Sequence, residues 1–262
     1  MNLYFDVTLA EGYNSASQST RRLTENWVGK NMFCPRCGNE VINHMKNNSP
    51  VGDFICPRCD NQYELKSKGG KYGKKVIDGA YETMIKRITG SENPDFFFIS
   101  YSSKEYKVND MFLVPKHFFT PNIVEKRNPL SPKAKRAGWV GCNILLDQIP
   151  REGIIDIISN GIVNDSITVL AKTNRAQSLE TSDLSARGWL MDILLCVNKI
   201  NTDEFSLSDM YAFEPFLFAR HPHNNNIKPK IRQQLQMLRE KGFIEFLGNG
   251  KYRKVPVFRR EL

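Results

Sequence analysis

The stretch NSPVGDFICPRCDNQYELK, residues 48–66, decides the fold because two kinds of site are interleaved within it. Asp53 opens a short apolar strand, and residues 62–66 alternate in polarity as a second strand does. Residues two apart in a strand share a face, so Glu64 and Lys66 point the same way. If the two strands pair as a hairpin, Asp53 can lie beside Glu64.

This arrangement predicts a metal-dependent phosphodiesterase site. Two carboxylates on adjacent strands suit Mg²⁺, which keeps several of its waters. A metal held by Asp53 and Glu64 would lower the pKa of a bound water, while Lys66 positions or polarises the nucleophile. Asp53, Glu64 and Lys66 are therefore the predicted catalytic residues. The spacing alone carries little weight, and the alternative is a solvated hairpin with ordinary surface charges.

Four cysteines form two CxxC pairs separated by eighteen residues: Cys34, Cys37, Cys56 and Cys59. Each pair places two thiolates on one side of a tetrahedron, and four thiolates leave no open coordination position. We therefore predict a structural Zn²⁺. The alternatives are two disulfides or four ordinary thiols, although cytosolic thiols stay reduced. The second pair lies inside the predicted hairpin, so zinc should fix the shape of that hairpin.

Length and composition indicate a cytoplasmic protein with one or two domains. The 262 residues are 40% hydrophobic, which suffices for a packed core. The first residues, MNLYFDVTLAEGYN, do not read as a signal peptide, and no apolar run is long enough to span a membrane. The unpaired Cys142 and Cys196 should be core or loop thiols.

The positive charge is concentrated near the C-terminus. Residues 226–262 hold ten Lys or Arg against three Asp or Glu, or +7 of the net +9. A basic region on a nearly neutral body is typical of a protein that binds a polyanion, and the alternative is a region that only aids solubility.

The first part of the chain reads as an α/β domain. In order, we expect a helix at 15–29, the hairpin, a basic glycine-rich loop at 66–75, a helix at 77–88, and strands at 95–101, 111–114 and 153–159. Residues 130–143 form a basic loop in which Lys135 and Arg136 precede Trp139. Cations beside a flat ring suit nucleic acid, and the alternative is that Trp139 is a core anchor.

The last part reads as a compact DNA-binding unit. A polar linker at 171–183 precedes helices at 189–197, 205–218 and 226–242 and a hairpin at 243–254. Three helices and a hairpin are the winged-helix arrangement, with a recognition helix for the major groove and a wing for the backbone. The alternative is a winged helix used for protein contacts. The predicted DNA contacts of this unit are Lys230, Arg232, Gln233, Gln236, Lys251 and Arg253.

With these motifs in place, the chain resembles the DpnI-type methyl-directed restriction endonucleases of the PD-(D/E)XK superfamily. The resemblance rests on Pro50 before Asp53 and on ELKSK (64–68), DGAY (78–81), NPDFFF (93–98), KRAGWVGCN (135–143) and IRQQLQMLREK (231–241). It implies a PD-(D/E)XK nuclease domain with a structural zinc site at residues 1–183 and a winged helix at 184–262.

The resemblance further implies Mg²⁺-dependent cleavage of double-stranded DNA at GATC when the adenine is N6-methylated. It implies that Trp139 contacts the methyl groups, that the partner is methylated DNA, and that the enzyme destroys incoming methylated DNA such as that of a phage. We expect a monomer, although the sequence does not give the oligomeric state. Two other functions stay open: a non-cleaving winged-helix reader of methylated DNA, and a nuclease without methyl specificity.

Overall fold

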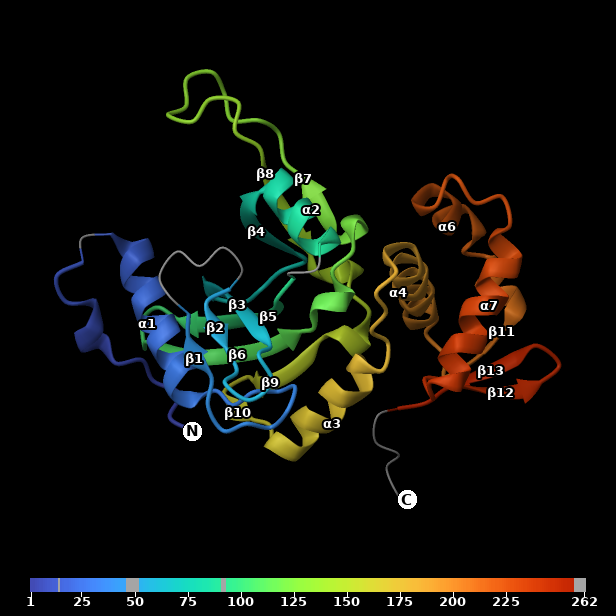
Figure 1. The fold of residues 1–262 in the computed structure, drawn as a ribbon, viewed down its shortest axis with the longest axis horizontal. Helices are drawn as coiled ribbons and strands as arrows, with labels where there is room; N and C mark the ends of the chain where they lie inside the picture. Colours follow the sequence, from blue (N-terminus) through green and yellow to red (C-terminus); the bar gives the residue numbers. More distant parts are fainter. Residues whose placement is uncertain (14, 46–51, 91–92, 257–262) are drawn as a thin grey trace.

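The structure is a computed structural model that describes residues 1–13, 15–45, 52–90 and 93–256. Pro50 and residues 257–262 of the predicted winged-helix unit lie outside the described residues. The chain is a mixed α/β protein with one large sheet, one small sheet packed on it, and a C-terminal unit of helices with its own sheet (Figure 1). Within the described ranges, no helix is long and apolar enough to cross a membrane.

The large sheet has seven strands in the order β1-β2-β3-β5-β6-β9-β10. Strands β3 and β5 are parallel, and their neighbours pair antiparallel. The predicted strands at 95–101 and 111–114 are confirmed, and the one at 153–159 begins two residues later. The bounds are β1 (Asn43–His44), β2 (Phe54–Ile55), β3 (Gln62–Gly69), β5 (Asp95–Ser102), β6 (Lys107–Val114), β9 (Ile155–Ser159) and β10 (Ile162–Val163).

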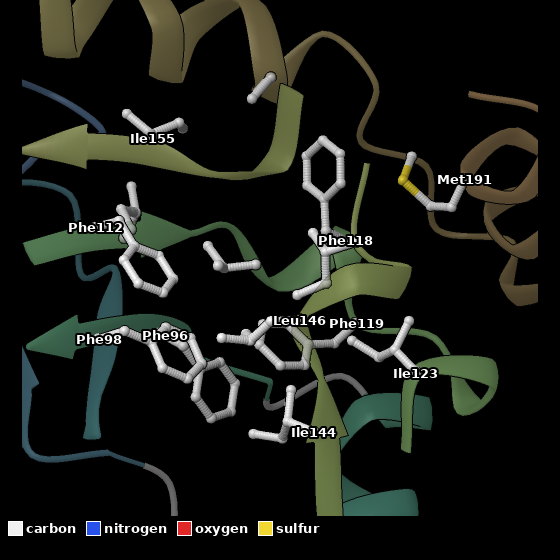
Figure 2. Packing of buried hydrophobic residues seen from close by; sticks show 14 of the residues in the cluster. Phe96, Phe98, Phe112, Phe118, Phe119, Ile123, Ile144, Leu146, Ile155 and Met191 are labelled. Atoms are coloured by element: carbon white, nitrogen blue, oxygen red, sulfur yellow. The ribbon is translucent and has the colours of Figure 1, made fainter. Parts of the chain in front are cut away.

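The apolar strand β5 organises the core because it is buried on both faces, as its sequence predicts. Its Phe98 stacks on Phe112 of β6 with ring centroids 4.9 Å apart, and the ring centroids of Phe96 and Phe119 are 4.2 Å apart. Figure 2 shows Ile144, from the small sheet, beneath these rings. The small sheet is therefore packed on the large one through this cluster.

The small sheet has the order β4-β8-β7 and corrects one prediction. Residues 77–88 were expected to be one helix, but the segment starts as strand β4 (Lys75–Ala80) and becomes helix α2 (Tyr81–Thr89) only afterwards. The strand forms because β8 (Gly141–Leu145), distant in sequence, supplies its backbone partners, with β7 (Val124–Lys126) on the far side. The predicted basic loop is also shorter, since β3 runs to Gly69.

Two long helices pack on the large sheet. The predicted first helix is confirmed as α1 (Ala16–Asn31), which buries Leu23 and Trp27 and lies against β3. The predicted linker at 171–183 is wrong over its first half, where the helix α3 (Ser166–Gln177) packs on β9. Val169, Thr173 and Ala176 of α3 are buried. The short 3₁₀ turns are η1 (Val7–Ala10), η2 (Lys116–Phe118), η3 (Pro121–Ile123), η4 (Leu146–Gln148) and η5 (Arg151–Gly153).

The C-terminal unit contains the predicted last helix and hairpin. Its helices are α4 (Leu184–Lys199), α5 (Leu207–Tyr211), α6 (Glu214–Arg220) and α7 (Ile227–Glu240), and its strands are β11 (Glu204–Ser206), β12 (Ile244–Gly248) and β13 (Lys251–Lys254). The expected single helix at 205–218 is wrong, because the end of β11 and a break after Tyr211 divide it. The hairpin β12–β13 adds β11 as a third strand.

Polar contacts join the C-terminal unit to the rest of the chain. The Asp192 carboxylate of α4, almost wholly buried, accepts a hydrogen bond from Asn122 Nδ2 at 3.1 Å. The same carboxylate pairs with Arg220, whose other nitrogen donates to Gln148 Oε1 at 2.6 Å. Helix α4 also lies against η2. The orientation of the C-terminal unit is therefore specified by buried hydrogen bonds as well as by packing.

Candidate active site and nucleic-acid interface

The predicted hairpin is confirmed, and it places Asp53 at the strand that carries Glu64 and Lys66. Phe54 and Ile55 of β2 pair antiparallel with Tyr63 and Gln62 of β3. The Asp53 amide donates to the Tyr63 carbonyl at 2.8 Å, and Asp53 Oδ2 accepts from the Leu65 amide at 2.8 Å. Hydrogen bonds thus hold Asp53 by both its backbone and its side chain, next to the part of β3 that contains Glu64.

Glu64 and Lys66 belong to a charged network with two residues that the sequence did not single out for a role. Lys66 Nζ donates to Glu64 Oε1 at 2.5 Å and also to Asp78 Oδ1 of β4. The second oxygen of Glu64 is paired with Arg87 of α2. All four side chains are at most 20% exposed. The DGAY stretch contains Asp78, but nothing local in the sequence indicates that it reaches Lys66.

Burial and neighbouring charges set the protonation of this site. Burial raises the pKa of Asp53, which the Leu65 amide opposes and nearby Glu25 of α1 reinforces. Arg21 lies between these acids, 2.5 Å from Glu25 Oε1 and 3.8 Å from Asp53 Oδ1. Burial lowers the pKa of Lys66, but the carboxylates of Glu64 and Asp78 outweigh it, so the net effect raises that pKa and the ammonium is charged.

The four cysteines of the two CxxC pairs come together as one group that could hold a metal ion. Their sulfur atoms all lie within 4.8 Å of one another, and none forms a disulfide: Cys34, Cys37, Cys56 and Cys59. The pairs Cys34–Cys59 and Cys37–Cys56 have their sulfurs 3.6 Å apart. Thiolates at about 2.3 Å from a tetrahedral Zn²⁺ would be roughly 3.8 Å apart, so the group fits zinc.

Both cysteine pairs have the same local geometry. The amide of Gly38 donates to the Cys34 carbonyl at 2.9 Å, and the amide of Asp60 donates to the Cys56 carbonyl at 3.0 Å. Gly38 and Asp60 have φ values of 77° and 55°, in the left-handed region that closes each knuckle. Burial raises the pKa of the Cys34 and Cys59 thiols, so a cation would be needed to hold them as thiolates.

Trp139 lies in a long arm, residues 127–140, that connects β7 to β8 and extends from the body of the molecule (Figure 1). The arm is closed by two backbone hydrogen bonds: the Leu130 amide donates to the Trp139 carbonyl at 2.9 Å, and the Gly138 amide donates to the Leu130 carbonyl at 3.0 Å. Trp139 is half-buried and is not a member of the apolar core, while Lys135 and Arg136 are exposed. The Arg136 guanidinium lies 4.5 Å from the centre of the Trp139 ring.

The predicted DNA contacts of the C-terminal unit differ in their availability. Helix α7 exposes Arg232, Gln233 and Gln236 on the face opposite its buried residues. Lys230 is half-buried near the Trp189 ring. On the hairpin, Lys251 is exposed, whereas the Arg253 guanidinium is held by Glu204 at 2.6 Å and Glu245 at 3.6 Å. The exposed candidates therefore gather on α7 more than on the hairpin, although Arg232 donates to the Tyr211 hydroxyl at 2.6 Å and Gln236 to Glu240 at 3.0 Å.

Comparisons with known families cover nearly all of the chain. The model of the DpnI family, described as the Dam-replacing family, matches residues 1–182. A second model of the same family, described as the Dam-replacing HTH domain, matches residues 185–254. The first match takes in the hairpin of Asp53, the cysteine group and the arm of Trp139, and the second takes in α7.

Proposed function

The chain belongs to the DpnI (Dam-replacing) family, and from this premise we propose that it is a type II restriction endonuclease that cleaves double-stranded DNA at GATC sites carrying N6-methyladenine. We assign residues 1–183 to a PD-(D/E)XK nuclease domain and residues 184–262 to a winged helix. The two family matches, which meet between residues 182 and 185, support this division.

The observation that carries the proposal is the position of Asp53, directly before β2, where its carboxylate accepts from the Leu65 amide between Glu64 and Lys66 of β3. Asp53 and Glu64 would hold Mg²⁺. The fit is good because burial and the nearby carboxylate of Glu25 both raise the pKa of Asp53. A bound cation would offset both effects by stabilising the ionised carboxylate. When bound, Mg²⁺ supplies activation of water and stabilisation of the leaving oxygen.

The residues of the chain itself perform the remaining work. Lys66 is charged and held on the same strand face as Glu64, so it can orient the attacking water and stabilise negative charge on the phosphate. Glu64 has one oxygen paired with Lys66 and the other with Arg87, so a bound cation would share this carboxylate with them. The cysteine group would hold Zn²⁺ as a structural ion that fixes the hairpin bearing Asp53.

Recognition of the methyl group is assigned to the arm and to the winged helix together. Trp139 offers a flat apolar surface at the arm, with Lys135 and Arg136 for phosphates. Burying one methyl contributes only ~0.8 kcal/mol, and two methyls in a symmetric site about 1.6 kcal/mol, or little more than tenfold. Selectivity against abundant unmodified DNA is therefore better achieved when α7 also recognises the methylated site, since the discrimination by the arm and the discrimination by α7 multiply.

The proposed partner is methylated double-stranded DNA, and the proposed setting is the cytoplasm, where a monomeric enzyme would destroy incoming methylated DNA such as that of a phage. The direct test of the chemistry is a linear duplex with one methylated GATC, incubated with Mg²⁺ or with EDTA. We expect two fragments with Mg²⁺ and none with EDTA or with the Asp53→Ala variant. Binding without cleavage would favour the non-cleaving reader, and equal cleavage of an unmethylated duplex would favour the nuclease without methyl specificity.

A further inference from the structure

The charged partners of Glu64 and Lys66 come from one continuous segment of the chain. Asp78, which pairs with Lys66, lies on β4, and Arg87, which pairs with Glu64, lies on the helix α2 that follows directly. We call residues 75–89 the β4–α2 segment. Strand β4 belongs to the small sheet and β3 to the large one, so the pair Lys66–Asp78 connects the two sheets at the active site.

The same segment is bonded to the base of the arm. Strand β4 pairs with β8, the strand into which the arm leads, and Asp78 lies opposite Cys142 in this pairing. The amide of Tyr81, the first residue of α2, donates to the carbonyl of Val140 at 3.1 Å. Val140 is the next residue after Trp139, whose ring packs so closely over Gly141 that a side chain there would clash with it.

Asp78 lies on the inward face of β4, just before a bulge. The pairing of β4 with β8 shifts between Asp78 and Ala80, so Gly79 is an extra residue without a partner across the strand. Ile77, which precedes Asp78, is 71% exposed, whereas the Asp78 side chain is 12% exposed and contacts Lys66. Asp78 thus shares the inward face of β4 with the buried Val76, and the regular alternation of the strand before the bulge places this carboxylate next to Lys66.

We propose that Asp78 and Arg87 are positioning residues for Lys66 and Glu64, and that the β4–α2 segment transmits the position of the arm on methylated DNA to this pair. The inference rests on the proposed function, because it assigns DNA contact to the arm and chemistry to the hairpin. A movement of the arm base displaces β8, and β8 carries β4 with it through their ladder. Lys66 and Glu64 then shift through their ion pairs, and a misplacement of about 1 Å can change a rate about 100-fold.

The positioning role is tested with Asp78→Asn in single-turnover cleavage of a methylated duplex. We expect a rate at least about tenfold lower, with duplex affinity in Ca²⁺, measured by fluorescence anisotropy, unchanged within twofold. Asp78→Glu, which keeps the charge, should recover part of the rate. The matched control is Glu82→Gln, an exposed carboxylate of the same segment that pairs with Lys126 of β7 rather than with the site. A normal rate in Asp78→Asn overturns the positioning role.

The coupling is tested by a double-mutant cycle with Trp139→Ala. We expect the double variant to be no slower than the slower single variant, because both changes break one pathway. If the rate losses of the two single variants multiply in the double variant, the arm and Asp78 act independently. If Asp78→Asn does not fold, as judged by its thermal unfolding, Arg87→Gln takes its place in the cycle.

Amide hydrogen exchange over residues 75–89 gives a readout that needs no cleavage. We expect exchange in this segment to slow when the unaltered chain binds a methylated duplex in Ca²⁺, and the slowing to vanish in Trp139→Ala. Exchange that is unchanged by the duplex would overturn the coupling, whether or not the protein cuts DNA. Failure of the unaltered chain to cut any DNA would instead count against the proposed function alone.

Discussion

The hydroxyl of Tyr63 lies 3.0 Å from the sulfur of Cys34 and so connects the cysteine group to the strand that carries Glu64 and Lys66. The Tyr63 ring is wholly buried and stacks on Phe97, with ring centroids 4.7 Å apart. A hydrogen bond to a metal-bound thiolate orients the ligand and is part of the strength of such sites. The cysteine group and β3 should therefore depend on each other.

The first prediction concerns the metal content of the cysteine group. The purified chain should contain one zinc ion, and Cys56→Ser should contain almost none and unfold at a markedly lower temperature. Tyr63→Phe keeps the stacking and should weaken zinc binding about tenfold, as the loss of an outer hydrogen bond does. Zinc is measured by elemental analysis and by competition with a chelator. Cys142→Ser, a buried thiol outside the group, is the control and should keep its zinc.

The second prediction concerns Lys66. Lys66→Ala should lower the single-turnover rate by about 10²–10⁴-fold, because it removes the charge that we propose to orient water and stabilise the phosphate. Affinity for the methylated duplex should change little, since Lys66 is mostly buried beside Glu64. Lys68→Ala, two residues along the same strand and exposed, is the control and should retain the rate. Equal losses in both variants would refute a specific role for Lys66.

The third prediction separates the contribution of the arm from that of helix α7. Trp139→Ala should lower the preference for methylated over unmethylated sites by about tenfold. Lys135→Ala should weaken binding to both kinds of site equally and reduce its salt dependence by about one charge. Gln233→Ala on α7 should lower the preference independently of Trp139→Ala, so that the two losses multiply. Unchanged selectivity in every α7 variant would refute a second methyl test.

Substitutions on α7 are a better test than deletion of residues 184–262. Deletion would also remove α4, whose Asp192 is hydrogen-bonded to Asn122 and whose surface packs on η2. A truncated chain would expose that surface and could lose affinity and selectivity for this reason alone. Point substitutions on exposed residues such as Gln233 leave the contact between the two units intact.

The fourth prediction concerns stability at acidic pH. His117 is almost wholly buried, and burial lowers its pKa to about 4, while its Nε2 donates to the Ala176 carbonyl at 2.8 Å. The unfolded chain binds this proton near pH 6.5 and the folded chain only near pH 4. His117 should therefore reduce the free energy of unfolding as pH falls from 6.5 to 4, by up to about 3 kcal/mol, with no further loss below pH 4.

Urea unfolding at pH 7, 6 and 5 measures this effect. His117→Gln, which can still donate to Ala176, should lose less stability between pH 7 and 5 than the unaltered chain does. His223→Gln, an exposed histidine, is the control and should follow the unaltered chain. The same pH dependence in all three proteins would contradict the role of His117.

The sequence predicted those features that depend on local spacing. Two CxxC pairs at this spacing can bring their thiols together in only a few arrangements. A continuous apolar run such as Phe96–Ile99 is rarely found outside a strand that is buried on both faces. The hairpin of Asp53 and the strand β5 were therefore predictable from their own residues. The half-buried position of Trp139, outside the core, was one of two alternatives that composition left open.

Features that depend on distant partners were not predictable in this way. Residues 77–88 carry a helical stripe, but β8 binds the first part as a strand, and this contact is what brings Asp78 to Lys66. The polar segment after Ala171 reads as a linker, yet it completes α3 because Thr173 and Ala176 pack against the sheet. In both cases the tertiary contact outweighs the local preference of the residues.

The measurement that tests the central claim most directly is a competition between two plasmids of different length in one reaction. One carries N6-methyladenine at its GATC sites and the other does not, and both are incubated with the protein and Mg²⁺. We predict fragments from the methylated plasmid alone, and none from either with Asp53→Ala. Cleavage of both plasmids at similar rates, or of neither, would contradict methyl-directed cleavage at this site.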